Sequence, residues 1–277
     1  MELTTAQETG TGDEAPVMDE QDGLSQERTI ALILERSKRT NRTVPIRRSF
    51  LQQAASAASA SGRKTPGPLR TLVSKKQERP LDIYLLLAAV TGAGDYSATD
   101  WSTTWARSVG LFDENTGGAA VSRAWKALKD LQLVSTSRGE GRKTKVTKLL
   151  EDGTGRPYKQ PGDSPYFQLP FEYWEKGFNT KLSLPGKAML LIALSLRKTE
   201  FSLVHARIQD WYGINPQTVA KGINELIEHH VLEQSGLEWF DTLHTRSGRG
   251  SRPLYQFQDP FVPIGLDTPA QETPSEQ

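Results

Sequence analysis

Cysteine is absent from this 277-residue chain, which excludes disulfide bonds and zinc sites built from thiolates. No apolar run approaches the roughly 20 residues that a membrane-spanning helix needs; the longest extends only over 83–90. The first 27 residues contain neither lysine nor arginine, nor the apolar stretch of a secretory signal. We therefore expect a cytoplasmic protein with no membrane partner.

The net charge of +1 conceals an uneven distribution. Eleven of the 33 acidic residues lie in 1–27 and 263–277, where there are no basic residues. Residues 28–262 therefore carry 34 basic against 22 acidic side chains, a net charge of about +12. Acidic ends around a basic body fit a polyanion-binding protein whose ends limit non-specific association. Solubilising ends on an ordinary domain are the alternative.

Composition divides the chain into six segments. Polar, acidic sequence predicts disordered tails over 1–27 and 263–277. Twelve bases against one acid between Arg28 and Lys76, together with an Ala/Ser run, predict a basic, flexible arm and linker over 28–79. This arm either reaches along phosphates or is a solvated spacer, and it contains one short helix near 30–39. Glycines and prolines predict a second linker over 151–165, so folded units are expected over 80–150 and 166–262.

One stretch of the chain occurs twice. Residues 121–134 and 219–232 align in register, 98 positions apart, with apolar groups at helical spacing. Each copy runs into a β-like segment, followed by a glycine-containing loop rich in arginine or lysine. Two further helices are predicted before each copy, and the second of these ends at Gly110 or Gly213. Both units thus read as helix, helix, turn, helix, strand, loop, strand.

This order is that of a winged helix. The predicted fold class is therefore mainly α with small β-hairpins, an α+β chain with two tandem winged helix-turn-helix domains. In such a domain the third helix enters the major groove of DNA, and the preceding helix crosses the backbone. The predicted partner is double-stranded DNA.

The third helices and the hairpins supply the candidate DNA-binding residues. Arginine pairs with guanine, and asparagine or glutamine with adenine; a solvated amphipathic helix is the alternative. The candidates on the recognition helices are Ser122, Arg123, Lys126, Gln217, Thr218, Lys221 and Asn224. Cations of the two hairpins, or wings, suit phosphates better than base edges. They are Arg138, Arg142, Lys143 and Lys145 in wing 1 and Arg246, Arg249 and Arg252 in wing 2.

Signals of catalysis are missing. Gly186-Lys187 is followed by Ala188 and has no upstream glycine, so it is not a P-loop. No serine lies in a nucleophile elbow, and the four histidines show no metal-ligand spacing. We expect no enzymatic activity, no cofactor and no metal. Binding of single-stranded nucleic acid would require exposed aromatic residues, whereas internal positions are predicted for Trp101, Trp105, Trp125 and Trp211.

Segments 106–111, 121–128 and 211–226 resemble the helix-turn-helix of winged-helix regulators. Two such units in tandem resemble replication initiators and transcriptional regulators of bacterial plasmids and phages, especially those of actinobacteria, to which Leu182 to Ala188 is also similar. The resemblance covers 80–258. It implies a sequence-specific binder of double-stranded DNA, associated with the nucleoid or a plasmid. A protein-docking module of a DNA-associated complex is the alternative, and self-association or contact with the replication or transcription machinery stays open.

Overall fold

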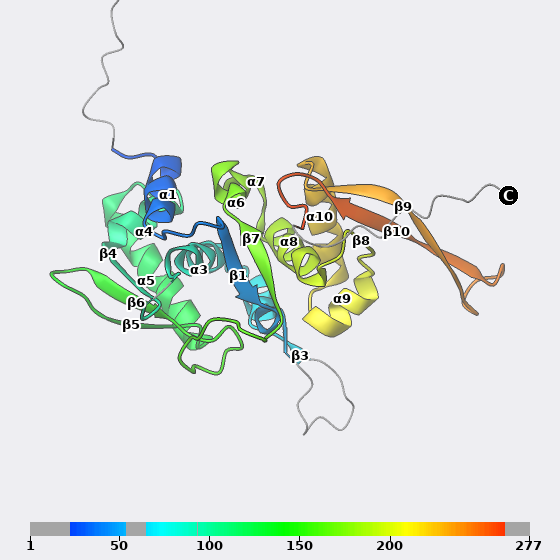
Figure 1. The fold of residues 1–277 in the computed structure, drawn as a ribbon, viewed down its shortest axis with the longest axis horizontal. Helices are drawn as coiled ribbons and strands as arrows, with labels where there is room; N and C mark the ends of the chain where they lie inside the picture. Colours follow the sequence, from blue (N-terminus) through cyan, green and yellow to red (C-terminus); the bar gives the residue numbers. More distant parts are fainter. Residues whose placement is uncertain (1–22, 54–64, 93, 264–277) are drawn as a thin grey trace, which may run out of the picture.

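The computed structural model describes residues 23–53, 65–92 and 94–263 (Figure 1). Within these ranges the chain is a mixed α/β protein with ten α-helices and small antiparallel sheets. The tails predicted to be disordered fall largely on 1–22 and 264–277, and most of the Ala/Ser run falls on 54–64, outside the described residues. None of the described helices is both long and apolar enough to cross a membrane.

The first unit extends from α3 to β6. Its elements are α3 (Glu78–Val90), β4 (Ser97–Asp100), α4 (Ser102–Ser108), α5 (Glu114–Asp130), β5 (Val134–Arg138) and β6 (Thr144–Lys148). The strands form an antiparallel sheet in the order β4-β6-β5. The three predicted helices and the hairpin are confirmed, although α3 and α5 begin earlier than the sequence indicates. Strand β4 is an addition to the prediction.

The second unit repeats this arrangement. Its elements are β7 (Tyr166–Pro170), α6 (Glu172–Glu175), α7 (Phe178–Lys181), α8 (Leu184–Leu196), β8 (Glu200–Phe201), α9 (His205–Tyr212), α10 (Pro216–Glu228), β9 (Leu232–Asp241) and β10 (Arg249–Phe257). The sheet order is β8-β10-β9. From α8 onward, both the element order and the strand order equal those of the first unit, so the chain contains one topology twice.

Local signals explain where α9 ends and α10 begins. Gly213 adopts φ +66°, a left-handed conformation that glycine tolerates and that ends a helix. The Asn215 side chain then accepts a hydrogen bond from the backbone nitrogen of Gln217 at 2.8 Å, and Pro216 occupies the first turn. The buried Val219 and Ile223 lie on one face of α10. The opposite face is therefore left to polar residues.

The segment predicted as a flexible arm is largely folded, and that prediction is wrong for its described residues. It forms α1 (Gln26–Glu35), β1 (Thr43–Arg47), the 3-10 helix η1 (Arg48–Phe50), β2 (Gln52–Gln53), β3 (Thr65–Pro66) and α2 (Leu69–Ser74). Val44, Ile46 and Phe50 are buried. Burial of each such side chain stabilises the fold by about 1.5–3 kcal/mol, which favours an ordered segment in spite of its many basic residues.

Strands β1 and β7 join the two units. They pair antiparallel, with Val44 opposite Leu169 and Ile46 opposite Phe167. Helix α3 packs against β1, and α8 packs against β7. Figure 1 shows this pair of strands in the middle of the molecule, with the sheet of each unit directed outward at opposite ends. Helices α3 and α8, the first helices of the two units, thus pack against the same central pair of strands.

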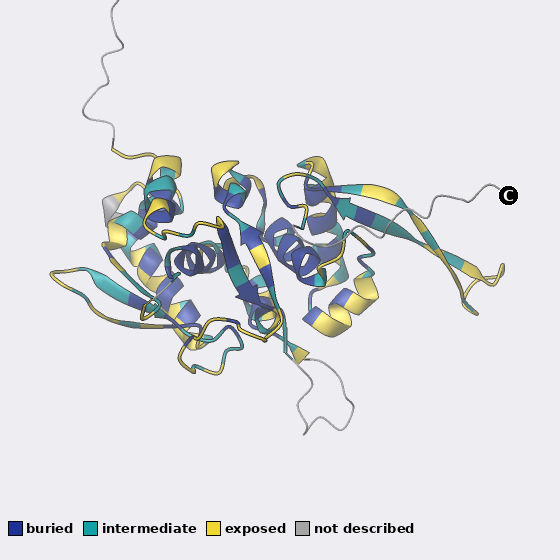
Figure 2. Cartoon of the chain, in the orientation of Figure 1, coloured by how far each residue is buried: buried dark blue, intermediate teal, exposed yellow. Residues whose placement is uncertain are grey.

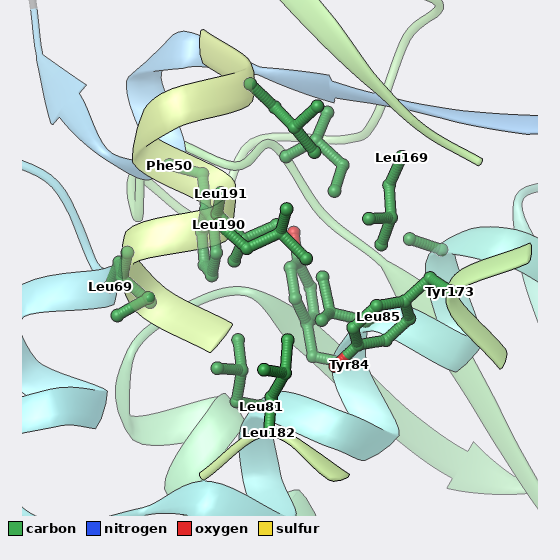
Figure 3. Close-up of a cluster of buried hydrophobic side chains, with 14 of the residues drawn as sticks. Phe50, Leu69, Leu81, Tyr84, Leu85, Leu169, Tyr173, Leu182, Leu190 and Leu191 are labelled. Atoms are coloured by element: carbon green, nitrogen blue, oxygen red, sulfur yellow. The ribbon is translucent and has the colours of Figure 1, made fainter. Parts of the chain in front are cut away.

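One hydrophobic core extends through both units. Buried residues concentrate in α3, α8 and the central strands (Figure 2). Figure 3 shows the side chains from the N-terminal half and from the C-terminal half in one cluster: Phe50, Leu69, Leu81, Tyr84 and Leu85 with Leu169, Tyr173, Leu182, Leu190 and Leu191. Because the core is shared, the units hold fixed positions relative to each other.

The segment 151–165, predicted as a linker, is also anchored to the body. Glu151 is fully buried and forms ion pairs with Arg47 of β1 at 2.6 Å and with Lys148 of β6 at 2.9 Å. Tyr158 is buried beneath both cations. The connection therefore restrains the two halves instead of leaving them free to move.

Candidate nucleic-acid interface

Helix α5 presents its candidate residues to solvent. Val121, Trp125 and Leu128 are buried, and the opposite face exposes Ser122, Arg123 and Lys126. The Ser122 hydroxyl donates to the carbonyl oxygen of Gly118 at 2.9 Å within the helix. Lys126 lies 3.0 Å from Asp130 in an exposed ion pair, which contributes little to stability and is readily exchanged for another anion. All three predicted residues are therefore accessible.

Helix α10 is built in the same way. Val219, Ile223 and Leu226 are buried, whereas Gln217, Lys221 and Asn224 are exposed and Thr218 is half-buried. Lys221 lies 3.8 Å from Glu225, whose carboxylate also accepts a hydrogen bond from the Ser183 hydroxyl at 2.6 Å. Glu225 is thus committed mainly to the start of α8. The Lys221 ammonium, with 63 % of its side chain exposed, faces outward.

Two grooves border these helices. One, of about 580 Å³, is lined by α5 through Ala120, Arg123 and Ala127, and we call it the α5 groove. The other, of about 540 Å³, is lined by Gln217, Thr218 and Lys221, and we call it the α10 groove. Lys76 and Glu78 line both grooves. The turn between α2 and α3 therefore lies between the two predicted recognition helices.

This turn contributes cations that the sequence assigns to no site. Lys75, Lys76 and Arg79 are exposed there, and Lys76 adopts φ +53°, which turns the chain sharply before α3. Lys75 and Lys76 fall in the predicted arm, so their proximity to α5 and α10 follows only from tertiary packing. Charge in the run Lys75–Arg79 is the one signal that points to them.

The α5 groove is also lined by two acidic residues, Glu78 and Asp82, and both form ion pairs with the buried Lys187. Lys187 is 2 % exposed and lies 2.8 Å from Glu78 and 2.7 Å from Asp82. Burial raises the pKa of Asp82 to about 6, against the opposing effect of Lys187. The cations Arg79 and Arg123 also line this groove, and both are exposed. A polyanion at this groove would therefore meet these two exposed cations, whereas the ammonium of Lys187 is buried.

Wing 1, the hairpin β5–β6, has two kinds of cation. Arg138 and Arg142 are exposed. Lys143 lies over the ring of Trp101, 5.7 Å from its centroid. Lys145 lies 2.6 Å from Asp95, and its ammonium lowers the pKa of that carboxyl to about 2. Arg142 is thus available to an external phosphate, whereas Lys145 already has an anionic partner.

Wing 2, the hairpin β9–β10, is longer than wing 1 and projects from the body (Figure 1). Arg246 and Arg249 are exposed near its tip. Arg252 forms two hydrogen bonds with Glu238, at 2.8 and 2.7 Å, and therefore braces the hairpin. The candidate cations of wing 2 thus divide into two that face solvent and one with an internal partner.

The sequence predicts that four tryptophans lie inside the protein, but only two of them do. Trp105 and Trp125 are buried and meet edge to face, with ring centroids 5.2 Å apart. Trp101 and Trp211 are 46 % and 41 % exposed, so the prediction is wrong for these two. Trp101 directly precedes α4, and Trp211 lies in the last turn of α9 with Arg207 over its ring, 5.9 Å from the centroid. A fifth residue, Trp239, is 65 % exposed on wing 2.

Within 23–53, 65–92 and 94–263, no group of three or more His, Cys, Asp or Glu side chains is arranged to hold a metal ion. A scan of the sequence against protein-family models found no match, and neither did a search of curated proteins.

Proposed function

We propose that the chain is a non-enzymatic, sequence-specific binder of double-stranded DNA, in which each unit acts as a winged helix. The observation that carries this proposal is the duplicated topology. Both units have the order helix, strand, helix, helix, strand, strand, and both sheets have the same strand order. In each unit the third helix exposes polar and cationic residues, as a helix in a major groove must.

The placement of the two helices on either side of one turn supports joint binding to one duplex. Arg123 and Lys221 border grooves that share Lys76. Phosphates between the two contacted stretches would meet Lys75, Lys76 and Arg79. Because the core holds the units in fixed positions, binding of the first helix orients the second, and two weak contacts combine into one stronger contact.

Base recognition and backbone contact are assigned to different residues. Arg123, Gln217 and Asn224 have the donors and acceptors that read guanine and adenine edges, each worth about 1–3 kcal/mol of discrimination. Arg142, Arg246 and Arg249 are exposed on hairpins and suit phosphates, which position the protein without reading sequence. Such a binder serves replication initiation or transcriptional regulation of a mobile element equally well, at a nucleoid or plasmid location.

The decisive experiment is selection of a binding site from a random duplex library, followed by affinity measurements on the selected duplex. Arg123→Ala and Lys221→Ala should each weaken binding of that duplex by about tenfold. Lys159→Ala is the matched control, because Lys159 is an exposed cation that borders neither groove and should have no effect.

Two results would reject the proposal. If no sequence is enriched from the library, the protein does not read base edges. If the protein binds a partner with an affinity that is unchanged as salt concentration rises, the helices serve as a protein-docking surface, because phosphate contacts release counterions and lose affinity with salt.

A further inference from the structure

Wing 2 is a two-stranded ribbon over most of its length. Strand β8 pairs with β10 only at Tyr255 and Gln256, near the body. Beyond that point β9 and β10 pair only with each other, with Leu237 opposite Pro253, Trp239 opposite Ser251 and Asp241 opposite Arg249. Because opposite residues share a face, Trp239, Ser251 and Arg249 lie on one side of the ribbon.

The other side of the ribbon is partly covered by its own side chains. Arg252 lies over the ring of Phe240, 5.4 Å from its centroid, and bonds Glu238. The Phe240 ring also covers Gly250, where a Cβ atom would come within 2.7 Å of it. On the first side, by contrast, Trp239 is 65 % exposed and Leu237 is 49 % exposed. Phe240 is 40 % exposed and lies beneath Arg252, so of the two aromatic rings the indole of Trp239 is the more accessible to solvent.

We propose that this face of wing 2 binds unpaired bases of single-stranded DNA, with Trp239 as the stacking platform and Arg249 as a phosphate contact. An aromatic side chain stacks on any base, so this contact needs no particular sequence. In an intact duplex both faces of each base are covered by neighbouring bases, and an indole gains the same contact only where bases are unpaired. The site thus goes beyond the proposed function, since its ligand is the opened strand.

Charge distinguishes this ligand from an apolar protein partner. His244, Arg246 and Arg249 surround the tip of the hairpin, and Asp241 is the one acid between 239 and 251. Exposed arginines attract a phosphate backbone, and binding that depends on them weakens as the salt concentration rises. Wing 1 has a related arrangement, because Lys143 lies over the exposed ring of Trp101. A cation of wing 1 thus lies over an exposed indole from the segment before α4.

The test uses the full chain and a fluorescently labelled oligothymidylate of about 12 nucleotides, within the usual range of single-strand site sizes. Anisotropy titration should show binding that Trp239→Ala weakens by about tenfold or more. Trp239→Phe should restore most of the affinity, because phenylalanine keeps a stacking face. Leu243→Ala is the control, since Leu243 is fully exposed at the tip but cannot stack, and its affinity should equal that of the wild type.

A duplex arm separates this proposal from the one above. Trp239→Ala should leave affinity for the selected duplex unchanged. If the wild type fails to bind the oligonucleotide while the selected duplex still binds, the single-strand site is rejected and the proposed function stands. Equal losses for both DNAs would show a duplex contact instead. A loss of self-association in size-exclusion chromatography with unchanged oligonucleotide affinity would show that the ribbon joins two copies of the chain, and would also reject the proposal.

Discussion

Lys187 Nζ lies 2.7 Å from Asp82 Oδ1, in an ion pair that ties α8 of the second unit to α3 of the first; the lysine side chain is 2 % exposed and that of the aspartate 17 %. Glu78 adds a second carboxylate at 2.8 Å. Loss of hydration raises the pKa of Asp82 to about 6, because burial outweighs the attraction of Lys187. The junction of the two halves therefore contains a carboxyl group that titrates in mildly acidic solution.

The pH dependence of stability should reveal this group. The native pKa of Asp82 lies above its unfolded value, so its stabilising contribution is full below about pH 4 and is lost as the pH rises through 6. Relative to Asp82→Asn, the free energy of unfolding of the wild type should fall by up to about 3 kcal/mol from pH 4 to pH 7. Urea unfolding of both proteins measures this difference, and a difference that rises with pH would refute the assignment.

Glu151 should be among the most sensitive positions for stability. It is fully buried and forms ion pairs with both Arg47 and Lys148, and burial lowers the pKa of Lys148. Glu151→Gln would leave two buried cations without a counter-charge, at a cost of about 3–5 kcal/mol. Asp130→Asn, which breaks an exposed pair with Lys126, should cost less than about 1 kcal/mol. Denaturant midpoints compare the two, and equal costs would contradict the role of burial.

Gly222 should tolerate no side chain. A Cβ atom there would lie 2.5 Å from Met189 Cγ and would also collide with the Pro185 carbonyl, because α10 and α8 pack closely at this point. Glycine to alanine within a helix usually stabilises by about 1 kcal/mol, but overpacking of this kind costs about 1–3 kcal/mol. Gly118→Ala in α5 is the matched control, since its nearest neighbour is Ser102 Oγ at 3.5 Å. Thermal unfolding should show opposite shifts for the two variants.

Helices with strong local signals could be predicted from the sequence. Asn215-Pro216 begins α10 and Gly213 ends α9, so both boundaries depend on neighbouring residues. Strands β4 and β8 could not, because they have four and two residues and no clear alternation. Strand β1 could not be predicted either, because the arginines on both sides of it make the segment resemble a solvent-exposed arm. Its Val44 and Ile46 become core residues only through pairing with β7, more than a hundred positions later.

In the candidate site, too, features set by local sequence could be predicted and features set by tertiary packing could not. The repeat leads to the exposed faces of α5 and α10, since the spacing of Val219 and Ile223 fixes which side is buried. The partners of individual cations could not be predicted: the pairs of Lys145 with Asp95 and of Arg252 with Glu238 depend on cross-strand or loop geometry. For the same reason the proximity of Lys76 to both helices appears only in three dimensions.

The ion pair between Lys145 and Asp95 leads to a prediction for wing 1. Arg142 is exposed, whereas Lys145 is held by Asp95, so the two cations should contribute unequally to phosphate binding. Arg142→Ala should weaken binding to all duplex sequences alike and reduce the slope of log affinity against log salt by about 0.9, the value for one lost phosphate contact. Lys145→Ala should change the slope much less, because Lys145 is paired with Asp95 and does not supply a phosphate contact.

The measurement is a series of affinities at increasing salt, for the selected duplex and for an unrelated duplex, with Lys159→Ala as the control. Reading of bases by Arg142 would appear as a loss confined to the selected duplex, with the unrelated one unaffected. Equal slopes for Arg142→Ala and the wild type would mean that wing 1 does not touch the backbone. Because the Lys145–Asp95 pair is internal to the first unit, a larger slope change for Lys145→Ala than for Arg142→Ala would show that the pair opens when DNA binds.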